Sequence, residues 1–79
     1  MTAPSNEELI KIDPILSYFN YEHLSPGPLR DTSRDFNHLA FDLVRRLPRN
    51  PERTVALRKL LESKDAAVRT ALDLLKSAS

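Results

Sequence analysis

The positions of the six prolines constrain this chain of 79 residues most strongly. Proline lacks a backbone N–H and is excluded from helix interiors, although it suits the first position of a helix. Pro14, the Pro26-Gly27-Pro28 run, Pro48 and Pro51 therefore divide the chain into short segments. Between these breaks the apolar residues recur at helical spacing, and no stretch alternates as a strand does. The pattern predicts an all-α fold.

The breaks also predict where each element begins and ends. Ser5 and Glu8 have the spacing of a capping box, and Asn50 is suited to cap the last helix. The short link Pro48–Pro51 makes the two long helices antiparallel neighbours. We expect a single helical hairpin domain over 1–79, with residues 1–4 frayed, a short helix over 6–19 that is kinked or broken near Pro14, a turn over 19–28, and long helices over 29–47 and 51–76.

Two apolar stripes run along the long helices. The expected core positions are Leu29, Phe36, Leu39, Ala40, Leu43, Val44 and Leu47, followed by Leu57, Leu60, Leu61, Ala67, Val68, Ala71, Leu72 and Leu75. Each stripe is wider than one neighbouring helix covers, and Leu74 and Ala78 widen the last one further. The chain has no cysteine, so no disulfide supports its small core. We therefore expect self-association into a helical homo-oligomer.

Composition argues against several functional classes. The net charge is +1, and beyond residue 25 eleven Lys and Arg face seven Asp and Glu, a small surplus for binding long nucleic acid. No apolar run approaches the roughly 20 residues that span a membrane, and no secretory signal is visible. Without cysteine, a glycine-rich phosphate loop or a histidine pair at metal spacing, we expect no catalysis, no metal and no cofactor.

Lys64 interrupts the apolar stripe of the last helix, since it lies between Leu60, Leu61 and Val68 on a helical wheel. A lysine at such a position costs free energy unless its ammonium meets an anion or reaches solvent. Two interpretations stay open: a lysine that snorkels or pairs with a carboxylate, and an ammonium that awaits a phosphate at an oligomer interface.

Two further groups carry polar chemistry. The outer face of the middle helix holds Arg30, Arg34, Asn37, His38, Phe41 and Arg45. Arginines beside an exposed ring suit phosphate binding and base stacking, and the alternative is a solvated face with Phe41 in an oligomer contact. For Arg45 we favour the second interpretation, a solvated charged face. In the turn, Phe19 and Leu24 suit a plug at the open end of the hairpin, whereas Tyr21 and His23 carry polar tips that need partners if buried.

Two stretches also carry a family resemblance. They are the F-x-Y-x-H-L-x-P turn, from Phe19 to Pro26, and the block ERTVALRKLLESKDAAVR, from Glu52 to Arg69. Together and in this order, over residues 18–72, they resemble the hairpin domain of phage-encoded anti-CBASS and anti-Thoeris sponge proteins. Members of that family are small helical proteins, commonly hexameric, that sequester cyclic nucleotide messengers of bacterial immunity without degrading them. Their ligands are cyclic dinucleotides, cyclic trinucleotides and, in some members, cyclised ADP-ribose derivatives.

The resemblance implies a non-catalytic sponge in the cytoplasm of an infected bacterial host, with ligand pockets between the protomers of a hexamer. It assigns Tyr21 and His23 to stacking or edge contacts with a base. In the family basic residues meet the phosphates, and Lys64, Arg69 and Thr70 fall in the matching last-helix block. Arg30 and Arg34 are candidates from their own chemistry and not from the resemblance. The alternative is a small helical interaction or scaffold module without a nucleotide ligand. Neither long nucleic acid nor a membrane is an expected partner.

Overall fold

The computed structural model describes residues 3–77, and every regular element in that range is a helix. The elements are α1 (Asn6–Ile12), the 3-10 helix η1 (Pro14–Phe19), α2 (Pro28–Arg46) and α3 (Pro51–Ser77). The prediction of an all-α fold is confirmed. Of the residues expected to be frayed, Ala3 and Pro4 have no regular structure, and residues 1–2 lie outside the described range.

The N-terminal segment consists of two short helices that meet at Asp13. The Ser5 side chain accepts a hydrogen bond from the Glu8 backbone N–H at 3.2 Å, which caps the start of α1. Asp13 leaves the helical conformation (φ −124°, ψ 84°) because a residue before proline is disfavoured in the α region. Pro14 then opens η1, which contacts all three α-helices and so lies at the centre of the fold.

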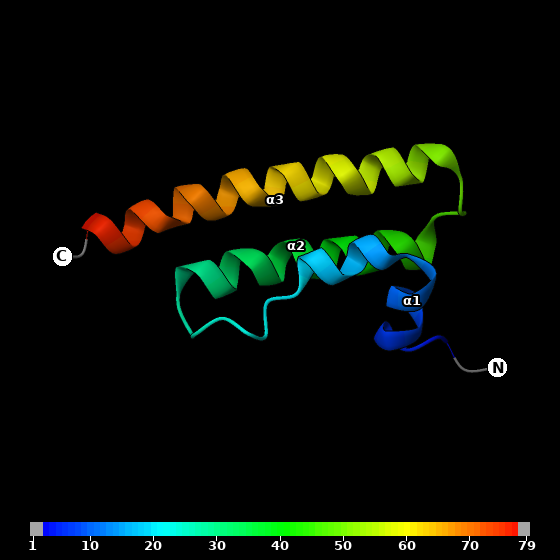
Figure 1. Ribbon diagram of the computed structural model, residues 1–79, viewed down its shortest axis with the longest axis horizontal. Coiled ribbons are helices and arrows are strands. Elements are labelled where there is room, and N and C mark those ends of the chain that lie inside the picture. The colour runs from blue at the N-terminus through cyan, green and yellow to red at the C-terminus, as the bar shows by residue number, and fades with distance from the viewer. Residues whose placement is uncertain (1–2, 78–79) are drawn as a thin grey trace.

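The two long helices form an antiparallel hairpin (Figure 1). Before α2, Gly27 adopts φ 147°, a conformation that L side chains rarely adopt, and Pro28 begins the helix. After the link, the Asn50 side chain accepts a hydrogen bond from the Arg53 backbone N–H at 2.8 Å and caps α3. η1 runs alongside α2, and α1 lies on the side of the molecule away from α3 (Figure 1).

The hydrophobic core lies where η1 meets the hairpin. Its buried members are Leu9, Leu16, Phe19, Ala40, Phe41, Val44 and Leu57. The expectation that Phe41 is exposed on an outer face is wrong, because its side chain is only 4% exposed. Conversely, Leu39 and Leu47, which the periodicity placed in the core, are 44% and 38% exposed. The N-terminal segment packs against the Phe41 side of α2. The buried face of that helix therefore differs from the predicted apolar stripe.

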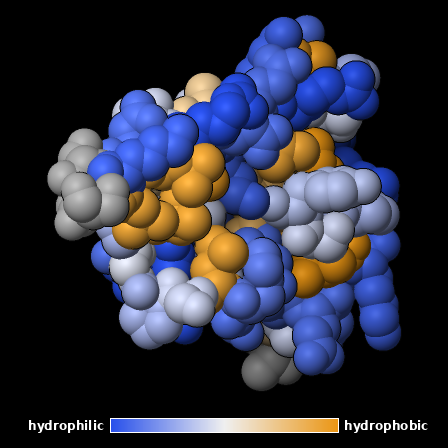
Figure 2. Space-filling view, turned by 60° about the vertical axis from the view of Figure 1, so that its left-hand side comes forward, coloured by the Kyte–Doolittle hydropathy of each residue, from blue (hydrophilic) through white to orange (hydrophobic). Residues whose placement is uncertain are grey.

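Several leucines near the C-terminal end of α3 stay exposed. Leu72, Leu74 and Leu75 are among them, and Figure 2 shows hydrophobic surface at this end of the molecule. Ala78, which was expected to widen the same surface, lies outside the described residues. Within residues 3–77, no helix has the length and apolar character needed to cross a membrane.

The Asn50 cap gives a first prediction. Asn50→Ala removes the acceptor for the Arg53 backbone N–H and should lower the free energy of unfolding by about 1 kcal/mol. For a domain of this size that corresponds to a melting temperature lower by roughly 4–8 °C, measured by circular dichroism. Ser63→Ala, at an exposed position inside the same helix, should leave the melting temperature unchanged or slightly higher. Equal effects of the two substitutions would contradict the cap.

Candidate functional site

A hollow of about 310 Å³ lies between the turn after η1, α2 and α3. Its lining residues are Asn20, His23, Leu24, Ser33, Lys64, Asp65, Val68 and Arg69. We call it the cationic hollow, because it brings together the predicted site residues His23, Lys64 and Arg69. They come from two segments about 40 residues apart in the chain, so the fold itself creates this juxtaposition.

Lys64 is half-buried, and its ammonium group bonds to the protein backbone. It donates a hydrogen bond to the carbonyl oxygen of Tyr18, at the end of η1, and lies 6.0 Å from the centroid of the Phe19 ring. Carbonyls at a helix end lack intrahelical partners, so this contact satisfies one of them. The sequence left open a carboxylate as the partner of Lys64, and within residues 3–77 the observed partner is this carbonyl instead. An ammonium has three N–H donors, so Lys64 can also bind an anion in the hollow.

The other ionisable side chains of the hollow are exposed. Arg69 and Asp65 lie one helical turn apart on α3, and His23 lies on the turn. Within residues 3–77, neither Arg69 nor His23 makes a side-chain hydrogen bond or ion pair. The guanidinium of Arg69 is therefore available to a ligand, whereas Asp65 disfavours an anion on its own side of the hollow.

Tyr21 belongs to a second group, on the other side of the turn. Its ring meets the His38 ring edge-on, with the centroids 6.0 Å apart. The Arg30 guanidinium lies 5.6 Å from the centroid of the Tyr21 ring, and it donates to the Leu24 carbonyl at 3.3 Å. Arg30 thus holds the turn in shape, which leaves it less available to a ligand than the sequence suggested.

Tyr21 and His38 line a separate hollow of about 460 Å³. Phe41 and Asn37 also line it, and the Asn37 side chain donates to the Phe19 carbonyl at 3.0 Å. Asn20 lines both hollows, so the two lie on either side of the start of the turn. Of the two residues that the resemblance assigns to a base, Tyr21 lines this hollow, whereas His23 lines the cationic hollow together with Lys64 and Arg69.

Three predicted site residues, Arg30, Arg34 and Thr70, line neither hollow. Arg34 forms an ion pair with Asp31 at 3.5 Å on exposed surface, where such a pair contributes little. The Thr70 hydroxyl donates to the Ala66 carbonyl one turn earlier at 3.1 Å.

Arg45, expected to be solvated, donates to the Asn6 side chain and lies 5.7 Å from the centroid of the Phe41 ring, so it ties α1 to α2.

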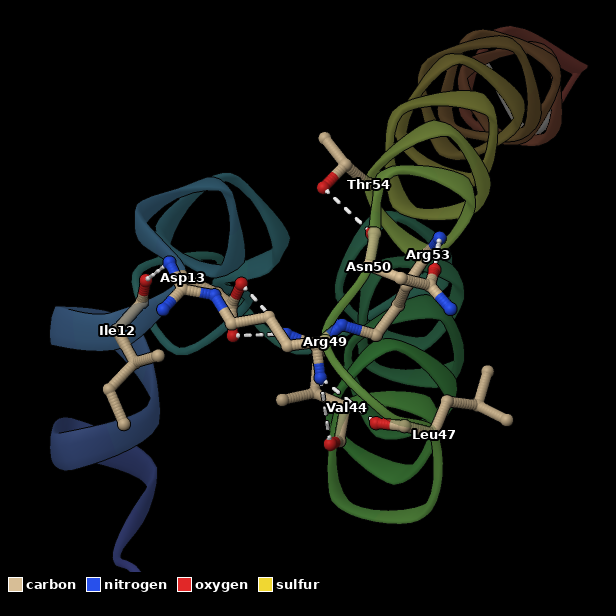
Figure 3. Close-up of polar contacts among 8 residues, drawn as sticks. All are labelled: Ile12, Asp13, Val44, Leu47, Arg49, Asn50, Arg53 and Thr54. Carbon is tan, nitrogen blue, oxygen red and sulfur yellow. Dashed lines mark hydrogen bonds and ion pairs between the residues drawn. The ribbon is translucent and has the colours of Figure 1, made fainter.

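Arg53 was not among the residues predicted from the sequence, and it is only 7% exposed. Its guanidinium forms an ion pair with Asp13 at 3.0 Å and donates to the carbonyls of Val44 and Leu47 at 3.3 and 3.1 Å (Figure 3). A signal was available, since Arg53 precedes Leu57 by four residues and therefore lies on the same apolar stripe as Lys64. The two cations hold the two ends of η1 against α3.

No match was found when the chain was compared with protein-family models, with curated proteins and with solved structures. In the part of the chain that the structure describes, no group of three His, Asp or Glu side chains is placed to hold a metal ion. The chemistry that the cationic hollow offers is the binding of a small anion by an ammonium, a guanidinium and an imidazole.

Proposed function

We propose that this protein is a non-catalytic phage sponge, which binds cyclic oligonucleotide messengers of bacterial immunity in the host cytoplasm and sequesters them. The observation that carries the proposal is the meeting of His23, Lys64 and Arg69 at one hollow. The resemblance of the turn and of the last-helix block to the sponge family supports the same reading. A sponge acts by stoichiometry and not by turnover, so it needs tight binding without a catalytic group.

A cyclic dinucleotide is a dianion with two flat bases, and the two hollows divide this chemistry between them. Lys64 and Arg69 suit a phosphate, because charge-assisted hydrogen bonds are the strong ones. Tyr21 offers a ring on which a base can stack. A hollow of about 310 Å³ is at the small end of ligand sites and fits a phosphate and its sugar better than a whole messenger.

Self-association is part of this proposal, because one protomer does not enclose the whole ligand. The exposed leucines of α3, including Leu72, Leu74 and Leu75, supply apolar surface for contact between copies. In a hexamer, as in the family that the chain resembles, a neighbouring copy covers the rest of the messenger. Guanidinium–phosphate contacts together with base stacking suffice for nanomolar affinity, about −12 kcal/mol.

A ligand panel tests the proposal directly. Cyclic dinucleotides and trinucleotides are titrated by calorimetry, with native mass spectrometry of the same samples to count copies and bound ligands. We expect at least one messenger to bind with a dissociation constant near nanomolar and to be recovered intact after heat release. A long oligonucleotide serves as the control and should not bind tightly. Absence of binding by every messenger would refute the sponge.

The second candidate function is a helical interaction or scaffold module, which the exposed leucines of α3 favour. Tyr21→Ala and Lys64→Ala separate it from the sponge. Lys64→Ala should weaken messenger binding by about 10- to 100-fold, since it removes a charge-assisted hydrogen bond, and should leave the oligomer intact. Loss of the oligomer without any messenger binding by the parent protein would favour the scaffold.

A further inference from the structure

Ser33 is a buried polar residue, and the proposed function gives it no role. It lies on α2 and is 2% exposed, yet it lines the cationic hollow. The basic residues of the hollow come from α3 and the turn, whereas Ser33 comes from α2. Its position makes it a polar group at the base of a site that is otherwise rimmed by exposed charges.

The Ser33 hydroxyl has no side-chain hydrogen bond within residues 3–77. A hydroxyl inside a helix commonly donates to the carbonyl one turn earlier, as Thr54 and Thr70 do at 3.5 and 3.1 Å. Every fully enclosed side-chain nitrogen or oxygen of the described residues has a partner. The unpartnered Ser33 oxygen therefore keeps part of the residue's small exposure, and Ser33 lines the hollow.

We propose that the Ser33 hydroxyl donates a hydrogen bond to an oxygen of a tetrahedral oxyanion, a phosphate ester or diester, in the cationic hollow. Ser33 reaches the anion from α2, while Lys64 and Arg69 reach it from α3. Donors on different walls suit an anion whose oxygens point in several directions. A hydroxyl that donates to an ionised oxygen forms one of the shorter and stronger hydrogen bonds.

In this proposal the anion lies nearer to Ser33 and Lys64 than to Asp65. Asp65 repels an anion at its own edge of the hollow, whereas Ser33 and Lys64 attract it toward the base. Lys64 keeps its bond to the Tyr18 carbonyl and offers a second N–H. The identity of the oxyanion as the phosphodiester of a cyclic messenger rests on the proposed function, but the anion site does not.

The test compares Ser33→Ala with the parent protein. Alanine is smaller by one oxygen and favours helix, so the fold should persist with equal or slightly higher stability. The dissociation constant of a cyclic dinucleotide should rise about tenfold, because one hydrogen bond to a charged group is lost. Ser63→Ala, at an exposed position of α3 outside the hollow, is the matched control and should leave binding unchanged.

A second variant keeps the proposal testable by a different readout. The chain has no cysteine, so Ser33→Cys places a single thiol at the base of the hollow. Inorganic phosphate or a cyclic dinucleotide should slow alkylation of that thiol several-fold. An alkylation rate that neither probe changes would overturn the proposal, as would an unchanged dissociation constant in Ser33→Ala.

The two proposals fail separately in these experiments. If cyclic messengers bind and Ser33→Ala binds them equally well, the oxyanion site is wrong and the sponge stands. If no messenger binds, but inorganic phosphate shifts the amide resonances around Ser33 and Lys64 in the parent protein and not in Ser33→Ala, the oxyanion site stands and the sponge is wrong. If neither probe binds, both are wrong.

Discussion

Arg53→Ala should lower the free energy of unfolding by about 3–5 kcal/mol, because it leaves the Asp13 carboxylate buried without its partner. Asp13 is 13% exposed and Arg53 7%, so solvent replaces little of what is lost. The substitution also removes the donor for the carbonyls of Val44 and Leu47 at the C-terminal end of α2. Small domains unfold with about 5–15 kcal/mol, so this loss is a large share of the total stability when the domain lies near the lower end of that range.

The position of Arg53 in its helix explains why it depends on Asp13. It lies in the first turn of α3, where the helix dipole disfavours a positive charge. Its guanidinium, however, reaches the last turn of α2, where free carbonyls and the opposite dipole end favour it. Asp13 supplies the remaining compensation and joins the α1–η1 junction to the hairpin.

Urea denaturation followed by circular dichroism measures this effect. Arg58→Ala, at an exposed position of the same helix, is the matched control and should change the free energy of unfolding by less than about 0.5 kcal/mol. A double-mutant cycle with Asp13→Ala should give a coupling energy above about 1 kcal/mol, since the two residues are in contact. If Arg53→Ala and Arg58→Ala are equally mild, the buried pair does not hold the fold together.

The helical elements could be predicted from the sequence because local chemistry decides them. Proline positions, the Asn50 cap and the helical period are properties of neighbouring residues, and α2 starts and ends one residue before the expected bounds. The burial of Phe41 could not be predicted in the same way. Periodicity shows which residues share a face of α2, but it does not show which face the N-terminal segment will cover.

The candidate site shows the same division. Lys64 could be singled out in the sequence because a charge on an apolar stripe is a local anomaly. It lies near His23 and Arg69 because the hairpin brings α3 next to the turn that precedes α2. Ser33 gives no such signal, because serine is common on helices and only its burial and its missing partner distinguish it. The contact of Lys64 with a backbone carbonyl is also invisible in a pattern of side chains.

Phe19→Ala is the second substitution with a large expected effect. The Phe19 ring is fully buried where η1 meets the hairpin, and removing it should cost about 3–5 kcal/mol of unfolding free energy through lost burial and the cavity left behind. The neighbouring Tyr18 is 66% exposed, so Tyr18→Ala should cost less than about 0.5 kcal/mol. Both free energies are measured by urea denaturation.

Phe19→Leu separates the role of the ring in the core from its role beneath the site. Leucine fills part of the space, so we expect a loss of about 1–2 kcal/mol and a folded protein. The Tyr18 carbonyl that Lys64 contacts, and the Phe19 carbonyl that Asn37 contacts, are backbone groups and remain in place. Under the proposed function, messenger binding by Phe19→Leu should therefore stay within a few-fold of the parent, even though its stability falls. If binding falls as steeply as in Lys64→Ala, the ring itself positions the ammonium, and the carbonyl contact alone is not enough.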